Sequence, residues 1–170
     1  MAQQSTRLPS GKAMLYNFLL NELLASHIVE GYTFWVLSPW VTNFALEHPY
    51  YVAFSELVST RHEELHIFDV FRQIAANGGQ VRITVGSDVR YYAPLRVLRD
   101  QSARIEVRVY RSLHAKAYAG HFGAVIGSLN LTDSGVHHNA ELYGYFHDQH
   151  SIAQVRQCCI EHFERGEPLL

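Results

Sequence analysis

Cysteine is scarce in this sequence of 170 residues, which contains only Cys158 and Cys159. Neighbouring cysteines seldom bridge each other, so nothing in the sequence indicates a disulfide framework or an oxidising compartment. No stretch reaches the ~20 uninterrupted apolar residues of a membrane helix, because polar residues interrupt even the most apolar candidate, residues 14–29. The N-terminal residues also lack the layout of a secretory signal peptide. We therefore expect a cytoplasmic protein without a membrane span.

An excess of charge of one sign is also absent, since the formal net charge is −2. With 48% hydrophobic and 18% charged residues, the composition excludes a disordered chain and favours one compact globular domain. The charges are unevenly distributed, because residues 82–116 contain eight Lys or Arg against three acids, whereas the remainder contains six against thirteen. This local excess favours a polyanionic partner, although some of these arginines are expected to be solvated or paired with nearby acids.

Hydrophobic periodicity predicts an α/β domain over residues 14–170, preceded by a loose tail over residues 1–13. Helices are expected over residues 14–29, 51–58, 61–76, 93–101 and 152–163. Strands are expected over residues 33–37, 81–85, 104–111, 114–119, 123–126 and 139–146. The run Asn77-Gly78-Gly79 is typical of the end of a helix. No internal repeat or low-complexity segment divides the chain.

Groups that can attack a phosphodiester are concentrated in residues 114–141. His114-Ala115-Lys116 is followed by Gly127-Ser128-Leu129-Asn130 and then by Asn139-Ala140-Glu141. An imidazole can act as nucleophile or proton donor near neutral pH, and an ammonium neutralises a phosphate oxygen. A carboxylate can hold an imidazole in one tautomer, and small residues let a backbone approach an anion. An enzyme that attacks a phosphodiester without a metal requires these groups.

The spacing of these groups is consistent with a common site. Residues i and i+2 of a strand point to the same face, so His114 and Lys116 are expected to project side by side. The alternation over residues 139–146 indicates a further strand, which could bring Glu141 back beside His114.

At these residues a resemblance to a known family is present. The runs His-Ala-Lys, Gly-Ser-Leu-Asn-Leu-Thr and Asn-Ala-Glu resemble the signature of the phospholipase D superfamily, the HKD phosphodiesterases. A weaker similarity covers residues 67–86 and Ser38-Pro39-Trp40, which is similar to the end of the family's first strand. One position departs from the pattern, because His121 stands where the family has a mostly structural aspartate. The resemblance implies a phospholipase D-like domain with a mixed β-sheet flanked by helices.

The resemblance also implies roles for individual residues, without a metal or any other cofactor. The expected catalytic residues are His114, Lys116, Asn130, Ser128 and Glu141. The expected substrate-binding residues are Ser38, Trp40, Arg111, His138 and Asn139. A single histidine is ordinarily a packed structural residue, but five matching polar positions together favour catalysis. Trp40, Tyr91 and Tyr92 could stack on bases, although core packing is the favoured role for Trp40. His138 could contact a substrate phosphate, although an ordinary loop position is favoured for it.

The sequence contains only one HxK motif. In this superfamily two such histidines face each other, one forming a phosphohistidine while the other protonates the leaving oxygen and later activates water. The single-motif members build this site across a homodimer, so we expect two copies of His114 to meet at a two-fold interface. The resemblance further implies nucleic acid as partner, with DNA favoured over RNA. It suggests a nuclease in phage defence, with a larger defence complex as a further expected partner.

Three other functions stay open. A phospholipase or phosphatidyl-transfer enzyme would need an exposed apolar rim or an interfacial helix. A catalytically silent subunit would bind nucleic acid and use the fold as a scaffold. A zinc peptidase would use His62, Glu63 and His66, because histidines four residues apart share a helical face and the glutamate would be the general base. No third zinc ligand is apparent in register, which makes the zinc peptidase the least favoured alternative.

Overall fold

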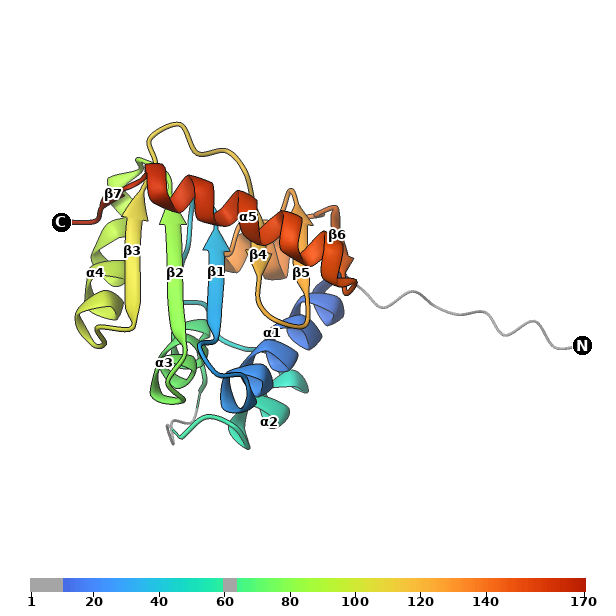
Figure 1. Cartoon of the computed structure of the whole chain (residues 1–170). Helices are drawn as coiled ribbons and strands as arrows, with labels where there is room; N and C mark the ends of the chain where they lie inside the picture. Colours follow the sequence, from blue (N-terminus) through green and yellow to red (C-terminus); the bar gives the residue numbers. More distant parts are fainter. Residues whose placement is uncertain (1–10, 60–63) are drawn as a thin grey trace, which may run out of the picture.

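The computed structural model of the chain describes residues 11–59 and 64–170. Its centre is a seven-stranded sheet with the strand order β6-β5-β4-β1-β2-β3-β7 (Figure 1). The strands are β1 (Thr33–Leu37), β2 (Gln80–Val85), β3 (Ile105–Val109), β4 (Ala117–Ala119), β5 (Ala124–Gly127), β6 (Tyr143–Phe146) and β7 (Glu167–Pro168). The helices are α1 (Gly11–Ile28), α2 (Tyr50–Ser55), α3 (Ile67–Ala76), α4 (Tyr92–Asp100) and α5 (Gln149–Arg165). The sheet is mixed and flanked by helices, so the predicted α/β fold is confirmed.

The sheet topology brings several strand ends to one edge. Strands β1, β2 and β3 are parallel neighbours. Strand β4 runs antiparallel to β1 with Ala117 opposite Leu37, and β5 runs antiparallel to β4 with Ile126 opposite Ala117. The ends of β1, β2, β3 and β5 therefore lie at the same edge as the start of β4. We refer to this edge as the carboxyl edge.

Helices cover both faces of the sheet (Figure 1). Successive residues of β1 point to opposite faces, so Phe34 and Val36 enter a large core while Leu37 enters a smaller one. The large core includes buried side chains of α1, α3 and α4, whereas the smaller one includes Ile152 and Val155 of α5. Each fully buried Phe or Leu contributes roughly 1.5–3 kcal/mol, so the two cores hold the sheet between its helical layers.

Local interactions determine where α3 begins and ends. The backbone N–H of His66 donates to the Asp69 carboxylate at 2.8 Å, an interaction typical of the first turn of a helix. At the other end Gly78 has a φ of 94°, a conformation that glycine adopts without a steric penalty. The helix predicted over residues 61–76 thus begins at Ile67, while residues 60–63 lie outside the described part.

Other element boundaries also differ from those predicted. Helix α1 begins at Gly11, so residues 11–13 belong to it rather than to the predicted tail. The predicted strand over residues 114–119 forms only from Ala117, because β1 ends opposite that residue. The predicted strand over residues 139–146 forms only from Tyr143, because β5 ends opposite it. Two short helices were not predicted: the 3₁₀-helix η1 (Val89–Tyr91) and the π-helix η2 (Ser134–His138).

None of the helices in residues 11–59 and 64–170 is long and apolar enough to cross a membrane.

Candidate active site

His114 and Lys116 lie at the carboxyl edge, in the loop that leads into β4. Lys116 Nζ is 3.4 Å from Nδ1 of His114 and donates to the backbone oxygen of His114 at 2.8 Å. The two side chains are therefore adjacent, as predicted, although neither residue belongs to a strand. His114 is exposed and Lys116 is half-buried, and within the described residues neither side chain forms an ion pair. The pair presents an imidazole and an uncompensated ammonium at this edge.

Ser128, Asn139 and Glu141 form a second polar group at the end of β5. The Ser128 hydroxyl and Asn139 Nδ2 both donate to the Glu141 carboxylate, the latter at 3.1 Å. The backbone N–H of Leu142 in turn donates to Ser128 Oγ at 3.1 Å. A side chain at Gly127 would lie only 2.3 Å from the backbone oxygen of Leu142, so this approach requires glycine. Three predicted catalytic or substrate-binding residues are thus brought together.

Glu141 does not reach His114 in a single chain. Both of its carboxylate oxygens accept hydrogen bonds from Ser128 and Asn139, and no hydrogen bond joins it to the imidazole within the described ranges. The expected contact between Glu141 and His114 is therefore not formed within the chain.

Ser38 lies in the interior, and Asn130 is half-buried. The carboxamide oxygen of Asn130 is buried and has no hydrogen-bond partner in the described part of the chain. The Ser38 hydroxyl donates to the backbone oxygen of Trp40 at 2.7 Å and accepts from the backbone N–H of Leu131 at 3.2 Å. Ser38 is fully buried, so it joins the end of β1 to the Asn130 segment, in place of the predicted contact with substrate.

Tyr118 was missed by sequence reasoning but helps to hold the same segment. It is fully buried in β4, and its hydroxyl donates to the backbone oxygen of Leu129 at 2.7 Å. Burial raises the pKa of Tyr118 above its usual range, so the phenol keeps the proton that it donates. No local pattern in the sequence distinguishes this tyrosine from one that only packs.

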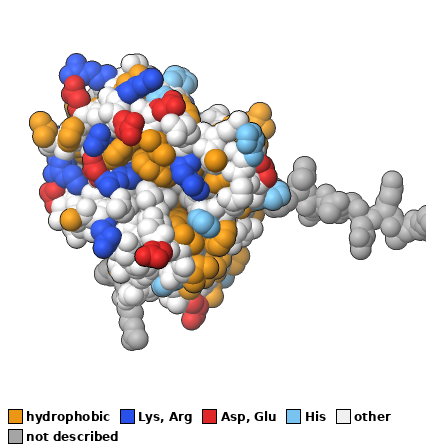
Figure 2. All heavy atoms as spheres, viewed as in Figure 1, with side chains coloured by type: hydrophobic (Ala, Val, Ile, Leu, Met, Phe, Trp, Pro, Cys, Tyr) orange, Lys and Arg blue, Asp and Glu red, His pale blue; other side chains and the backbone are white. Residues whose placement is uncertain are grey.

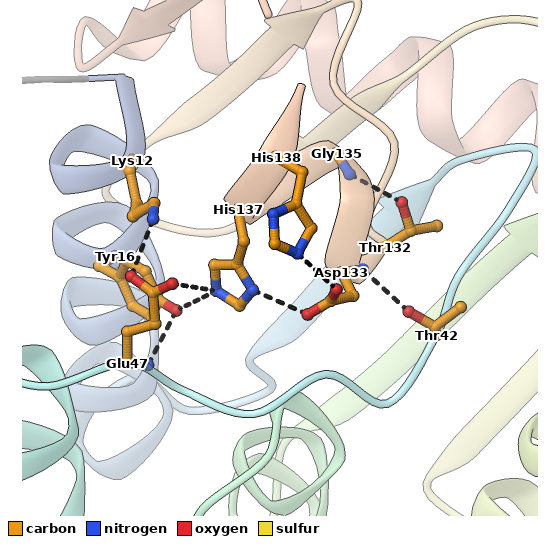
Figure 3. A network of polar contacts seen from close by, with 9 residues as sticks. All are labelled: Lys12, Tyr16, Thr42, Glu47, Thr132, Asp133, Gly135, His137 and His138. Atoms are coloured by element: carbon orange, nitrogen blue, oxygen red, sulfur yellow. Dashed lines mark hydrogen bonds and ion pairs between the residues drawn. The ribbon is translucent and has the colours of Figure 1, made fainter. Parts of the chain in front are cut away.

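The residues before Asn139 are held by a polar network between η2 and α1 (Figure 3). His137 lies between Asp133 and Tyr16, with Nδ1 2.9 Å from the Asp133 carboxylate and Nε2 3.0 Å from the Tyr16 hydroxyl. His138 also contacts Asp133, at 3.1 Å, and it is exposed. The backbone N–H of Glu47 donates to the Tyr16 hydroxyl at 3.1 Å. These contacts fix the π-helix that leads into Asn139 and Glu141, and π-helices occur frequently at functional sites.

The charges of this network are mutually compensating. The hydrogen bond from His137 lowers the pKa of the Asp133 carboxyl, and the hydrogen bond from Lys12 lowers that of Glu47. Burial raises the pKa of Tyr16 to about 12. A cavity of about 160 Å³ lies beside the network, lined in part by Lys12, His137, Asn139 and Glu141. The network therefore borders the Glu141 group.

Trp40 and Arg111 lie in loops at the carboxyl edge, Trp40 after β1 and Arg111 after β3. Trp40 is 42% exposed, so core packing is wrong for it, and its ring stacks on Tyr91 with the centroids 6.2 Å apart. Arg111 is exposed and lies three residues before His114. Both predicted substrate-binding residues are accessible.

Residues 50–165 of the chain match the sequence model of a protein family described as "Cardiolipin synthase, PLD-like domain". The chain belongs to this PLD-like family. The match includes His114, Lys116, Asn130 and Glu141, whereas α1 and β1 precede it. Comparison with curated protein sequences gives no match.

Solved structures of low sequence identity share the PLD-like fold. Nuc from Salmonella typhimurium, described as a phospholipase D family member, is 13% identical over 89% of this chain and 88% of its own, with a TM-score of 0.59. NucT from Helicobacter pylori is 12% identical over 95% and 94%, with a TM-score of 0.62. TrmBL2, an archaeal chromatin protein described as showing a novel mode of DNA binding, is 11% identical over 92% and 49%, with a TM-score of 0.56.

The departure from the PLD-like pattern at His121 lies at the opposite edge of the sheet, in the β4–β5 turn. The backbone N–H groups of His121 and Phe122 donate to the carboxylate of Glu22, at 2.6 and 2.8 Å. The hydroxyl of Tyr32 donates to the same carboxylate at 2.9 Å. A side chain at Gly120 would lie 1.9 Å from Glu22 Oε2, so the turn closes around the carboxylate only with glycine there. A carboxylate from α1 thus binds the turn that lacks the family's aspartate.

Glu22 is fully buried, and sequence reasoning had treated it only as a polar interruption of an apolar helix. Burial raises its pKa above the usual range, although the hydrogen bonds from the turn act in the opposite direction.

The zinc-peptidase alternative receives no geometric support. His66 precedes the first residue of α3, so it does not lie on a helical face, while His62 and Glu63 lie outside the described residues. Across residues 11–59 and 64–170, no three His, Cys, Asp or Glu residues are grouped so that they could hold a metal ion.

Proposed function

We propose that this PLD-like chain is a metal-independent phosphodiesterase that hydrolyses nucleic acid at a site shared by two copies of the chain. The observation that carries the proposal is the exposed His114 imidazole beside Lys116, at an edge where both are accessible to a large substrate. The ammonium would neutralise a non-bridging phosphate oxygen while charge accumulates during attack. Ser128, Asn139 and Glu141 form the hydrogen-bonded group that accompanies this pair in the motif.

The reaction takes two displacements at phosphorus. The imidazole of one His114 attacks phosphorus and forms a phosphohistidine, while the leaving oxygen takes a proton from a second imidazole. That second imidazole then removes a proton from water, the water oxygen attacks phosphorus, and the phosphorus–nitrogen bond breaks. The product is a phosphomonoester and both histidines regain their initial state.

Two copies of the chain would supply the two imidazoles, because the sequence contains one HxK motif. Exposed apolar side chains near the site are consistent with a second copy covering them: Leu142, next to Glu141, is 84% exposed, and Ile126, next to Gly127, is 40% exposed. A two-fold axis beside His114 would bring both imidazoles to one phosphate.

Nucleic acid is favoured over lipid by the groups at the carboxyl edge. Arg111 and Lys116 form no ion pair in the described part of the chain, and Trp40 and Tyr91 offer aromatic surface. Figure 2 shows acidic side chains interspersed with the basic ones on the face that α5 covers. The similarity in fold to Nuc, NucT and TrmBL2 is consistent with this substrate, whereas the family description names cardiolipin synthase.

The test is a substrate panel in the presence of a metal chelator. The purified full chain is incubated with single-stranded DNA, duplex DNA, RNA and phosphatidylglycerol vesicles, alongside His114→Ala and the control His150→Ala, which alters an exposed histidine of α5. We expect cleavage of nucleic acid by the wild type and His150→Ala only, with rapid quenching trapping labelled nucleotide on the wild type. Turnover of the vesicles alone would instead indicate a phosphatidyl-transfer enzyme. Binding of nucleic acid without turnover would indicate a silent subunit.

A further inference from the structure

Trp40 and Tyr91 form an aromatic pair at the carboxyl edge, in which Trp40 is exposed and Tyr91 is half-buried. Their ring centroids lie 6.2 Å apart, their planes are inclined by 29°, and Trp40 keeps 42% of its surface exposed. A solvent-exposed indole stacked on a second ring offers a flat surface of the kind on which unpaired bases stack.

The two rings are held in place by their backbone. The backbone N–H of Gly86 donates to the backbone oxygen of Pro39 at 3.0 Å, and the hydroxyl of Tyr92 donates to the backbone oxygen of Gly86 at 2.9 Å. The Ser38 hydroxyl donates to the backbone oxygen of Trp40 at 2.7 Å. The loops that carry Trp40 and Tyr91 are thus joined beneath the rings, so the aromatic surface is formed before any ligand arrives.

This surface is connected to the HxK loop. The hydroxyl of Ser87 donates to the backbone oxygen of Arg111 at 3.4 Å, which joins the loop after β2 to the loop that carries His114. An open groove of about 500 Å³ begins at Ser87 and Arg111 and runs along Tyr92 and Arg96 toward residues 167–170. Arg111 therefore lies at the junction between the loop after β2 and the loop that carries His114.

The arginines near this groove differ in their availability. The guanidinium of Arg90 is bound to the carboxylate of Asp88, with Nη2 2.6 Å from Oδ2, so its charge is already compensated. Arg111 is exposed and forms no ion pair within the described residues. Arg96 forms no ion pair in the described part of the chain either, but its Nε donates to the backbone oxygen of Leu170 at 2.5 Å and its guanidinium lies over the Tyr92 ring. Arg111 is therefore the guanidinium near His114 that is available to a phosphate.

We propose that Trp40 and Tyr91 form a stacking site for an unpaired base, and that the substrate is a single-stranded nucleic acid whose phosphates contact Arg111 as well as His114. This inference rests on the proposed function, because it names the substrate of the same site. Every unpaired base has a free π face, whereas a base in a duplex already stacks on its neighbours. The competing explanation is that the two rings only pack two loops together.

The experiment measures binding by the non-hydrolysing His114→Ala chain in chelator, using fluorescence anisotropy. Three labelled probes are compared: an oligothymidylate about 12 nucleotides long, which is within the site size of a single-strand-binding fold, an abasic oligomer with the same phosphates, and a duplex of the same length. We expect Trp40→Ala to weaken binding of the oligothymidylate roughly 5- to 100-fold, the loss of one base–aromatic stack. Binding of the abasic oligomer and of the duplex should not change.

Matched variants separate stacking from charge and from folding. Trp40→Phe keeps an aromatic face and should retain most of the affinity for the oligothymidylate. Trp35→Phe alters the other tryptophan, which packs edge-on against Phe163 at 5.6 Å, and should change none of the three affinities. Arg111→Gln should weaken the oligothymidylate and the abasic oligomer by the same factor, because a phosphate contact does not depend on the base.

Two results would overturn the stacking site and leave the proposed function standing. One is unchanged affinity of Trp40→Ala for the oligothymidylate, with all three probes still bound. The other is an equal loss of affinity for the abasic oligomer or the duplex, which would indicate a general disturbance of the edge. If the His114→Ala chain bound none of the probes, the proposed function would fail together with this inference.

Discussion

The two ends of strand β4 differ in the exposure of the ionisable groups beside them. Before its first residue, His114 and Lys116 are accessible and form no ion pair in the described part of the chain. After its last residue, the turn around His121 surrounds the carboxylate of Glu22, which is fully buried and accepts three hydrogen bonds. One end therefore carries exposed groups that can bind a further ligand, and the other end is bound to a buried carboxyl group that already accepts three hydrogen bonds.

The difference indicates a division of roles along one strand of only three residues. A buried carboxylate that accepts backbone N–H groups contributes to stability, and its removal leaves those donors unsatisfied. An exposed imidazole and ammonium contribute little to stability and stay available for a phosphate. Substitutions at the two ends should therefore separate activity from stability.

The largest effect is expected at the exposed end of β4, the end beside His114 and Lys116. His114→Ala should reduce turnover by several orders of magnitude, because it removes the nucleophile, while the free energy of unfolding should change by no more than about 0.5 kcal/mol. Initial rates of oligonucleotide cleavage and urea unfolding of the same preparations measure both quantities. Near-wild-type turnover of the folded variant would contradict the assignment of His114.

At the buried end of β4, the turn around Glu22, a substitution should affect stability more than turnover. Glu22→Ala leaves two backbone N–H groups and the Tyr32 hydroxyl without their acceptor, so we expect a loss of about 3 kcal/mol in the free energy of unfolding. Turnover per folded molecule should stay close to that of the wild type. Glu30→Ala is the matched control, because Glu30 is exposed near the end of the same helix, and its stability should be unchanged. Equal stability of the two variants would remove the structural role of Glu22.

The ammonium offers a finer test of the exposed end. Lys116→Met should lower turnover by roughly 10²- to 10³-fold without loss of stability, because a positive charge aimed at the phosphate acts mainly in the transition state. Lys116→Arg should recover only part of the rate, because a planar guanidinium differs in shape from a point charge. Arg165→Met, at the exposed end of α5, controls for the loss of one positive charge. Equal rates in Lys116→Met and the wild type would exclude a phosphate-binding role.

The two ends also differ in how far sequence could predict them. The groups at the exposed end could be predicted because His114, Lys116, Ser128 and Asn130 form a motif with fixed spacing. The alternation of apolar residues predicted the strands around them. The predicted strand boundaries were wrong where they depend on a partner strand. Residues 114–116 are not in a strand because β1 ends opposite Ala117.

The buried end could not be predicted from local patterns. Glu22 and His121 are 99 positions apart, and no periodicity links a polar interruption of an apolar helix to a distant turn. The same is true of Tyr16 and His137, which are 121 positions apart. Such contacts arise only when the layers pack, so sequence patterns predicted the groups of the candidate site but not the interactions that hold them in place.

The pKa of Glu22 provides a smaller and more specific test. Burial raises it, so the stability that Glu22 contributes is fully present below its unfolded-state pKa, about 4.3, and is lost as the pH rises through the raised folded-state value. Glu22→Gln cannot ionise and should lack this decline, which has a maximum slope of about 1.4 kcal/mol per pH unit.

Urea unfolding of the wild type, Glu22→Gln and Glu30→Gln from acid to neutral pH measures the difference. Glu30→Gln should follow the wild type, because Glu30 is exposed. Identical pH profiles for all three proteins would show that Glu22 ionises as freely in the folded chain as in the unfolded one.

The smallest expected effect decides whether the exposed end works alone or in pairs. If two copies of His114 act on one phosphate, a mixed dimer of wild-type and His114→Ala chains lacks either the nucleophile or the acid and should be inactive. Activity should then fall as the square of the wild-type fraction, so an equimolar mixture keeps about one quarter of the activity instead of about one half. Mixing with Glu22→Gln, which leaves the exposed end intact, should cause no such loss. Subunit exchange is verified with differently labelled chains.

A linear decline with the wild-type fraction, or a fully active monomer in sedimentation at the assay concentration, would mean that one chain holds the whole site. The second proton donor would then have to come from the same chain, and His138 would be the first residue to substitute, because it is exposed beside Asn139 whereas His137 is already bound between Asp133 and Tyr16.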